Sequence, residues 1–135
     1  MKKLLSTKYS TGAFNVAMLL LRITAALLML GHGYDKLIHF SEQSSKFMNF
    51  MHLGPTLSYA LVVFAEFFCS LLLLIGLFTR LAAIPLIINM AVAVFIAHKG
   101  EVFGDGEHAA LYLGIYIVIL LLGAGRASVD SMIAK

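Results

Sequence analysis

An apolar run with one carboxylate near its middle limits this chain to a membrane fold. Leu57–Phe78 comprises 22 residues, apolar almost throughout, and Glu66 stands among them. A helix of that length spans about 33 Å, which is close to the hydrocarbon thickness of a bilayer. An unpaired carboxylate at that depth is costly. We therefore expect a membrane-spanning helix whose Glu66 has a partner or carries a proton.

The composition supports the same class of protein. The 135 residues are 61% hydrophobic and 13% charged, whereas a soluble domain is usually about half apolar and a quarter charged. We expect one integral membrane domain over residues 1–135, with the lipid bilayer as its first partner. The formal charge of +3 is small and unclustered, so we expect no nucleic-acid partner.

Four apolar runs set the expected architecture, with predicted spans at residues 14–31, 57–78, 81–97 and 108–123. Arg22 interrupts the first run, so we interpret this run as a span and not as a signal peptide. The short connection Thr79–Arg80 makes the second and third spans antiparallel neighbours. The predicted fold class is all-α, an integral membrane four-helix bundle.

The connections between the spans indicate an orientation. Tyr34–Pro55 mixes charged with aromatic and Met side chains, which predicts a short helix at the membrane interface. Six basic residues fall on the side of the N-terminus and three on the other side: Lys2, Lys3, Lys8, Arg80, Arg126 and Lys135 against Lys36, Lys46 and Lys99. This excess predicts that both termini are cytoplasmic.

Each predicted span carries a polar group at a similar depth. At 1.5 Å per residue, Arg22 and Glu66 lie about 15 Å from the outer ends of their spans, and Asn89 and Tyr116 about 12 Å. We predict an Arg22–Glu66 ion pair inside the bundle. Such a pair either belongs to a functional site or only fixes the register of the helices, and the sequence leaves both interpretations open.

Titratable side chains gather on the predicted outer side, where all five histidines fall: His32, His39, His52, His98 and His108. His32 and Lys36 are one helical turn apart. The candidate catalytic residues are Glu66, Arg22, His32 and His98, and the candidate cofactor-binding residues are Arg22, His32, Lys36, Glu66 and Tyr116. A quinone fits this pattern, because its ring needs an apolar slot and its oxygens need proton donors. Histidines at an interface can equally face water alone.

Metal and haem chemistry have weaker support. Cys69 is the single cysteine, and no Cys/His spacing typical of a metal site occurs, so we expect no metal. Two histidines on different helices could ligate a haem. His98, however, lies about half a turn from the face of Asn89, so we expect no haem.

The motifs together are similar to those of the DoxX family of small four-helix bacterial membrane proteins. Asn89 departs from the family pattern. The matching residues follow the family's order over nearly the whole chain: Arg22, GHGYDKL (31–37), Pro55, Glu66, GLFTRLAA (76–83), His98 and GRASVD (125–130). The resemblance implies a multi-pass protein of the bacterial inner membrane and a link to redox metabolism. Related small subunits take part in thiosulfate:quinone oxidoreduction.

The leading hypothesis is a redox-associated protein that binds a quinone or similar small ligand in the bundle, as a subunit or partner of an oxidoreductase. The alternative is a non-catalytic scaffold or assembly factor for a redox or stress-response enzyme. A small-molecule permease fits less well, because the short helices show no inverted repeats. Small-residue faces also allow a homo-oligomer.

Overall fold

The computed structural model describes residues 4–46, 54–97, 104 and 106–134, and in these residues the chain is helical without a strand. The elements follow in this order: α1 (Thr11–Ile38), α2 (Phe40–Gln43), the 3₁₀ turn η1 (Ser44–Lys46), α3 (Pro55–Val63), the π-helical segment η2 (Phe64–Cys69), α4 (Ser70–Ile75), α5 (Thr79–Val92), the π-helical segment η3 (Ala93–Ala97), α6 (Glu107–Leu122) and α7 (Val129–Ile133).

These elements combine into four long apolar helices, which confirms the all-α class. Three are long and apolar enough to cross a membrane: Thr11–Ile38, Pro55–Ile75 and Thr79–Ile96. The fourth, α6, has 16 residues, so it spans about 24 Å. The continuous helix Pro55–Ile75 consists of α3, η2 and α4, and Pro55 occupies its first turn, where a missing N–H is tolerated.

The first helix is longer than the sequence predicted. It begins at Thr11 and ends at Ile38, whereas the predicted span ended at Gly31. Tyr34 to Ile38 therefore extend α1 and do not belong to the connection. The predicted interfacial helix is reduced to α2 and η1, and the remainder of that prediction, over residues 47–53, lies outside the described residues.

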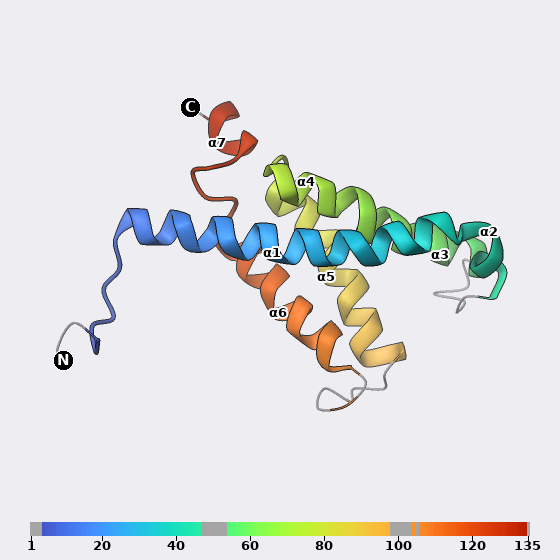
Figure 1. Ribbon diagram of the computed structural model, residues 1–135. Coiled ribbons are helices and arrows are strands. Elements are labelled where there is room, and N and C mark those ends of the chain that lie inside the picture. The colour runs from blue at the N-terminus through green and yellow to red at the C-terminus, as the bar shows by residue number, and fades with distance from the viewer. Residues whose placement is uncertain (1–3, 47–53, 98–103, 105, 135) are drawn as a thin grey trace.

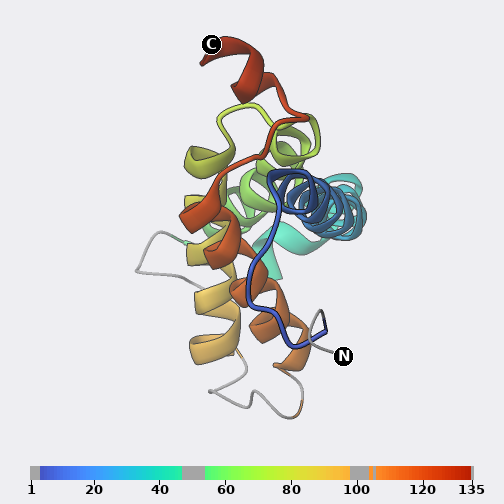
Figure 2. The same cartoon turned by 90° about the vertical axis from the view of Figure 1, so that its left-hand side faces the viewer.

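The long helices form two pairs that cross steeply. Figure 1 shows α1 lying along α3 and α4, while α5 and α6 run side by side across them. Figure 2 looks along α1 and shows the α5–α6 pair beside it. The core includes small side chains from α1 and α5, namely Ala25, Ala26, Ala82 and Ala83, among larger ones such as Leu73, Leu86 and Ile119. Small residues allow membrane helices to approach closely.

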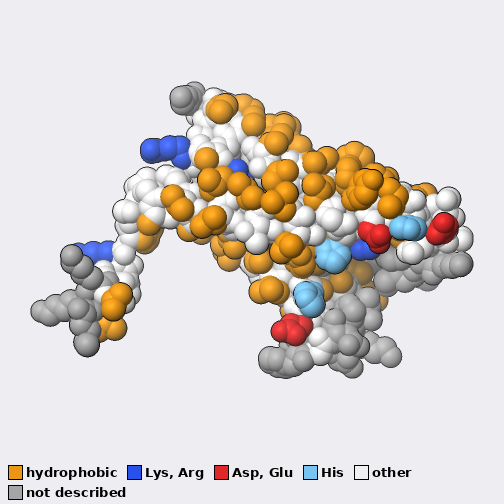
Figure 3. Space-filling model, in the orientation of Figure 1, with side chains coloured by type: hydrophobic (Ala, Val, Ile, Leu, Met, Phe, Trp, Pro, Cys, Tyr) orange, Lys and Arg blue, Asp and Glu red, His pale blue; other side chains and the backbone are white. Residues whose placement is uncertain are grey.

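The outer surface of the long helices is apolar, as Figure 3 shows for one face. Leu20, Leu81 and Leu111 are each more than 60% exposed. Exposed apolar area this extensive marks an interaction surface. Since it covers helices of membrane-spanning length, the surface matches a protein that is solvated by lipid.

Candidate functional site

Two side chains from other helices, Lys36 and Asn89, contact the carboxylate of Glu66. We call these three residues the polar centre. The ammonium of Lys36 lies 2.5 Å from Oε1 of Glu66, and Nδ2 of Asn89 donates to Oε2 at 2.9 Å. The side chain of Glu66 is only 4% exposed and that of Lys36 is 31% exposed. The buried carboxylate is thus paired on both oxygens, and the centre opens outward through Lys36.

Local backbone geometry places Glu66 in this position. Glu66 belongs to η2, a π-helical segment within the second helix. A π-helical turn changes the direction of the side chains around it, and such turns are frequent at functional sites. Gly33 of α1 lies directly against it, because a Cβ on Gly33 would stand 2.5 Å from the Glu66 carbonyl carbon. One turn further along α1, the backbone carbonyl of Lys36 accepts a hydrogen bond from the Tyr59 hydroxyl at 2.8 Å.

The predicted Arg22–Glu66 ion pair is wrong. The guanidinium of Arg22 donates instead to two backbone carbonyls, those of Ala124 at 2.6 Å and Ala127 at 2.7 Å. The register explains the difference. Arg22 stands eleven residues before Gly33, which is about 16 Å along α1, and it lies beside Gly76 at the far end of the second helix.

An aromatic group borders the polar centre, formed by His32, Tyr112 and Tyr116. The two tyrosine rings stack with centroids 6.0 Å apart, and His32 meets the Tyr112 ring edge-on at 6.4 Å. Tyr116 is fully buried, and no described residue hydrogen-bonds its hydroxyl. Tyr116 is close enough to Glu66 to interact with it electrostatically. A buried hydroxyl that no described residue hydrogen-bonds provides a donor for a ligand oxygen.

Titratable groups lie at the same end of the molecule as the polar centre. Figure 3 shows exposed histidine and acidic side chains over the α2 end of the molecule and the start of α6. His39 ends α1, and its Nδ1 lies 2.8 Å from the Asp35 carbonyl oxygen. That hydrogen bond raises the pKa of His39 above its usual value, and the carboxylates of Asp35 and Glu42 add to the effect. His98, a predicted site residue, lies outside the described residues.

A second polar cluster holds the C-terminal segment at the opposite end of α1, and we call it the Arg22–Asp130 cluster. The carboxylate of Asp130 accepts hydrogen bonds from the backbone N–H groups of Phe78 at 2.7 Å and Thr79 at 2.8 Å. These N–H groups begin α5, so Asp130 caps a helix from 51 residues away. Burial alone raises the pKa of Asp130, but these hydrogen bonds and the charge of Arg22 lower it below its usual value.

The structure therefore sorts the predicted site residues into two places. Lys36 and Glu66 pair in the polar centre, His32 and Tyr116 belong to the neighbouring aromatic group, and Arg22 joins the other cluster. Sequence reasoning missed the Lys36–Glu66 pair and the capping role of Asp130. The sequence held a signal for each. Lys36 lies on the same stripe of α1 as Arg22, and the GRASVD motif places the carboxylate of Asp130 shortly after the end of a predicted span.

Comparison with known proteins gives the same family as the sequence motifs. The DoxX family model matches residues 17–99. An uncharacterized protein of Haemophilus influenzae is 35% identical over 122 residues, covering 85% of this chain and 89% of that protein. An uncharacterized membrane protein of Mycobacterium tuberculosis is 33% identical over 125 residues, covering 73% and 76%. No solved structure matches the chain.

Proposed function

Because the chain belongs to the DoxX family of membrane proteins, we propose that it is a redox-associated protein of the bacterial inner membrane. It binds a quinone or similar small redox ligand beside the polar centre and works as a subunit or partner of an oxidoreductase. The observation that carries this proposal is the buried Glu66, which lies on a π-helical segment between Lys36 and Asn89. A buried ionisable group in a membrane helix is by default the starting hypothesis for a functional site.

The residues around Glu66 have the chemistry that a quinone needs. The Tyr112–Tyr116 stack offers an aromatic face to the ring, and the Tyr116 hydroxyl and the Lys36 ammonium offer donors to its oxygens. Reduction of a quinone to a quinol consumes two electrons and two protons. In this proposal the partner enzyme supplies the electrons, and protons arrive through Lys36 and His32, which lie near the exposed end of the site.

Purified protein tests the proposal directly. We expect bound quinone in an organic extract of the protein, and saturable binding when delipidated protein is titrated with a short-chain quinone. Glu66→Gln should weaken binding at least about ten-fold, because a carboxylate that orders two donors is lost. Glu107→Gln, which removes an exposed carboxylate at the start of α6, is the matched control and should bind normally. Absence of quinone from folded wild-type protein in both measurements would contradict the proposal.

A non-catalytic scaffold is the second candidate, and one observation favours it. Lys36 and Asn89 occupy both oxygens of Glu66 and tie three helices together, so the polar centre can serve the fold alone. In that case Glu66→Gln lowers the thermal stability while an oxidoreductase partner still co-purifies with the folded variant. Under the quinone proposal, the folded variant keeps its partner and loses the ligand.

A further inference from the structure

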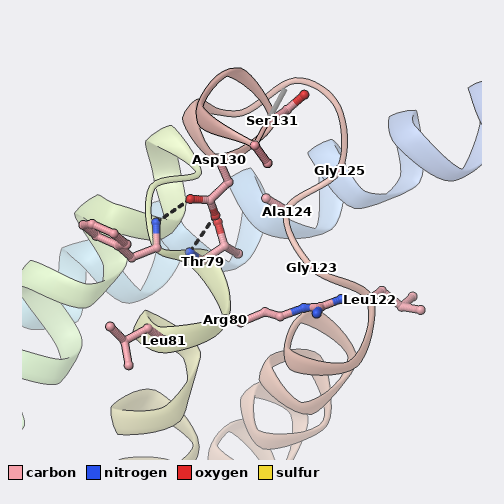
Figure 4. Close-up of a pocket in the computed structure, with 11 residues that line it drawn as sticks. Thr79, Arg80, Leu81, Leu122, Gly123, Ala124, Gly125, Asp130 and Ser131 are labelled. Atoms are coloured by element: carbon pink, nitrogen blue, oxygen red, sulfur yellow. Dashed lines mark hydrogen bonds between the residues drawn. The ribbon is translucent and has the colours of Figure 1, made fainter.

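A pocket of about 440 Å³ lies beside the Arg22–Asp130 cluster, at the opposite end of α1 from the polar centre. It is formed by the start of α5, the end of α6 and the beginning of α7, as Figure 4 shows. Arg80 reaches across it from α5 toward Leu122. The pocket is open on one side, and the quinone proposal does not involve it.

Arg80 brings unused hydrogen-bonding capacity to this pocket. Among the described residues, the only acceptor for its guanidinium is the Leu121 carbonyl, at a long 3.4 Å. A guanidinium carries five N–H donors. Gly123 leaves room for the side chain, because a Cβ there would stand 3.3 Å from Nε of Arg80. The guanidinium therefore lies over the backbone of Gly123, and most of its N–H donors are free for a ligand.

The other charges near the pocket do not cancel that of Arg80. Asp130 also lines the pocket, but both of its oxygens accept backbone hydrogen bonds from Phe78 and Thr79. The positive charge of Arg22 acts on the same carboxylate. Arg22 lies behind Asp130 and offsets its charge, so this region of the molecule, with Arg80, carries an excess positive charge.

The rim beside Arg80 is apolar and exposed. Leu81 is 65% exposed, Phe78 57% and Leu122 47%, and all three line the pocket. A ligand that satisfies the whole pocket has an anionic head for the guanidinium and an apolar tail for these side chains. The guanidinium fork suits phosphate oxygens in a bidentate arrangement.

We propose that this pocket binds the headgroup phosphate of an anionic phospholipid, with Arg80 as the anchoring cation and the acyl chains on Leu81 and Leu122. The proposal is independent of what the polar centre binds. It also agrees with the predicted orientation, because basic residues at the cytoplasmic end of membrane helices attract the anionic lipids of that leaflet.

The test measures the thermal stability of delipidated protein in detergent with added phosphatidylglycerol or phosphatidylcholine. We expect phosphatidylglycerol to bind about five-fold more tightly than phosphatidylcholine. This is the gain in affinity that one basic side chain provides near an anionic lipid surface. Arg80→Gln should abolish the preference. Arg126→Gln is the matched control, because Arg126 is exposed on the neighbouring segment and does not line the pocket, and it should retain the preference.

Three outcomes would overturn the proposal. Equal stabilisation of wild-type protein by both lipids removes the anionic preference, and this measurement needs no variant to fold. Retention of the preference in Arg80→Gln moves the site elsewhere. Full competition by inorganic phosphate alone points to a free anion and not to a lipid. If Arg80→Gln does not fold, Arg80→Lys replaces it, and a weakened but measurable preference supports the guanidinium contact.

Discussion

Gly33 lies against the backbone of Glu66, so closely that a Cβ atom on Gly33 would stand 2.5 Å from the Glu66 carbonyl carbon and 2.6 Å from its oxygen. Both atoms belong to a helical backbone and cannot rotate away. This contact fixes the register of α1 on the second helix. It also explains why Lys36, one turn beyond Gly33, reaches the carboxylate of Glu66.

The first prediction concerns this contact. We expect Gly33→Ala to lower the free energy of unfolding by about 1–3 kcal/mol, because the added methyl group forces the two helices apart. Gly31→Ala is the matched control. A Cβ on Gly31 meets nothing within 4 Å, so that variant should be as stable as wild type or slightly more stable. Thermal unfolding in detergent measures both, and equal stability of the two variants would contradict the register.

The second prediction separates the true partner of Glu66 from the one suggested by the sequence. In double-mutant cycles, Lys36→Met with Glu66→Gln should show a coupling of about 0.5–3 kcal/mol, because the two side chains touch. Arg22→Met with Glu66→Gln should be additive within about 0.5 kcal/mol, because distant sites do not couple. A large coupling between Arg22 and Glu66 would restore the ion pair that the structure rules out.

Much of the fold could be predicted from the sequence, because membrane helices leave long apolar runs. The helix made of α5 and η3 and the helix α6 agree with the predicted spans to within two positions at each end. The end of α1 was missed, because Asp35 and Lys36 are polar and read as a connection. Lys36 lies instead in the last turn of α1, where its ammonium is paired with Glu66. Its position on the stripe of Arg22 indicated the face of the helix and not the partner.

The candidate site was predictable in its residue types and not in its pairing. Depth counting correctly placed Asn89 near Glu66, as their hydrogen bond confirms. The same counting misplaced Arg22, because it assumed that the first helix ended at Gly31. An error of seven residues moves a side chain by about 10 Å along a helix. That distance decides which partner a charged group meets.

The third prediction tests the cap that Asp130 places on α5. We expect Asp130→Ala to lower the free energy of unfolding by about 2 kcal/mol, because the N–H groups of Phe78 and Thr79 lose their acceptors. Ser131→Ala is the control. It retains the backbone hydrogen bond from Ser131 to Ser128 Oγ at 3.2 Å and should be within about 0.5 kcal/mol of wild type. Unchanged stability of Asp130→Ala would mean that the turn does not depend on this carboxylate.

The last prediction follows from the lowered pKa of Asp130. Its hydrogen bonds and Arg22 hold the pKa below the ordinary value of 3.8. A group whose pKa is lower in the folded protein stabilises the fold above its unfolded pKa, and this contribution disappears as the pH falls through the folded pKa. The stability difference between wild type and Asp130→Asn should therefore be largest above about pH 5 and shrink toward about pH 3.

Thermal unfolding of the two proteins at stepped pH measures this difference and cancels the acid response that they share. Glu107→Gln is the matched control for the loss of a carboxylate, because Glu107 is exposed at the start of α6, at the opposite end of that helix from Asp130. A wild-type advantage over Asp130→Asn that stays constant from neutral to acid pH would contradict the prediction. The advantage would then come from the second acceptor oxygen, which Asn lacks, and the charge that caps α5 and faces Arg22 would contribute nothing.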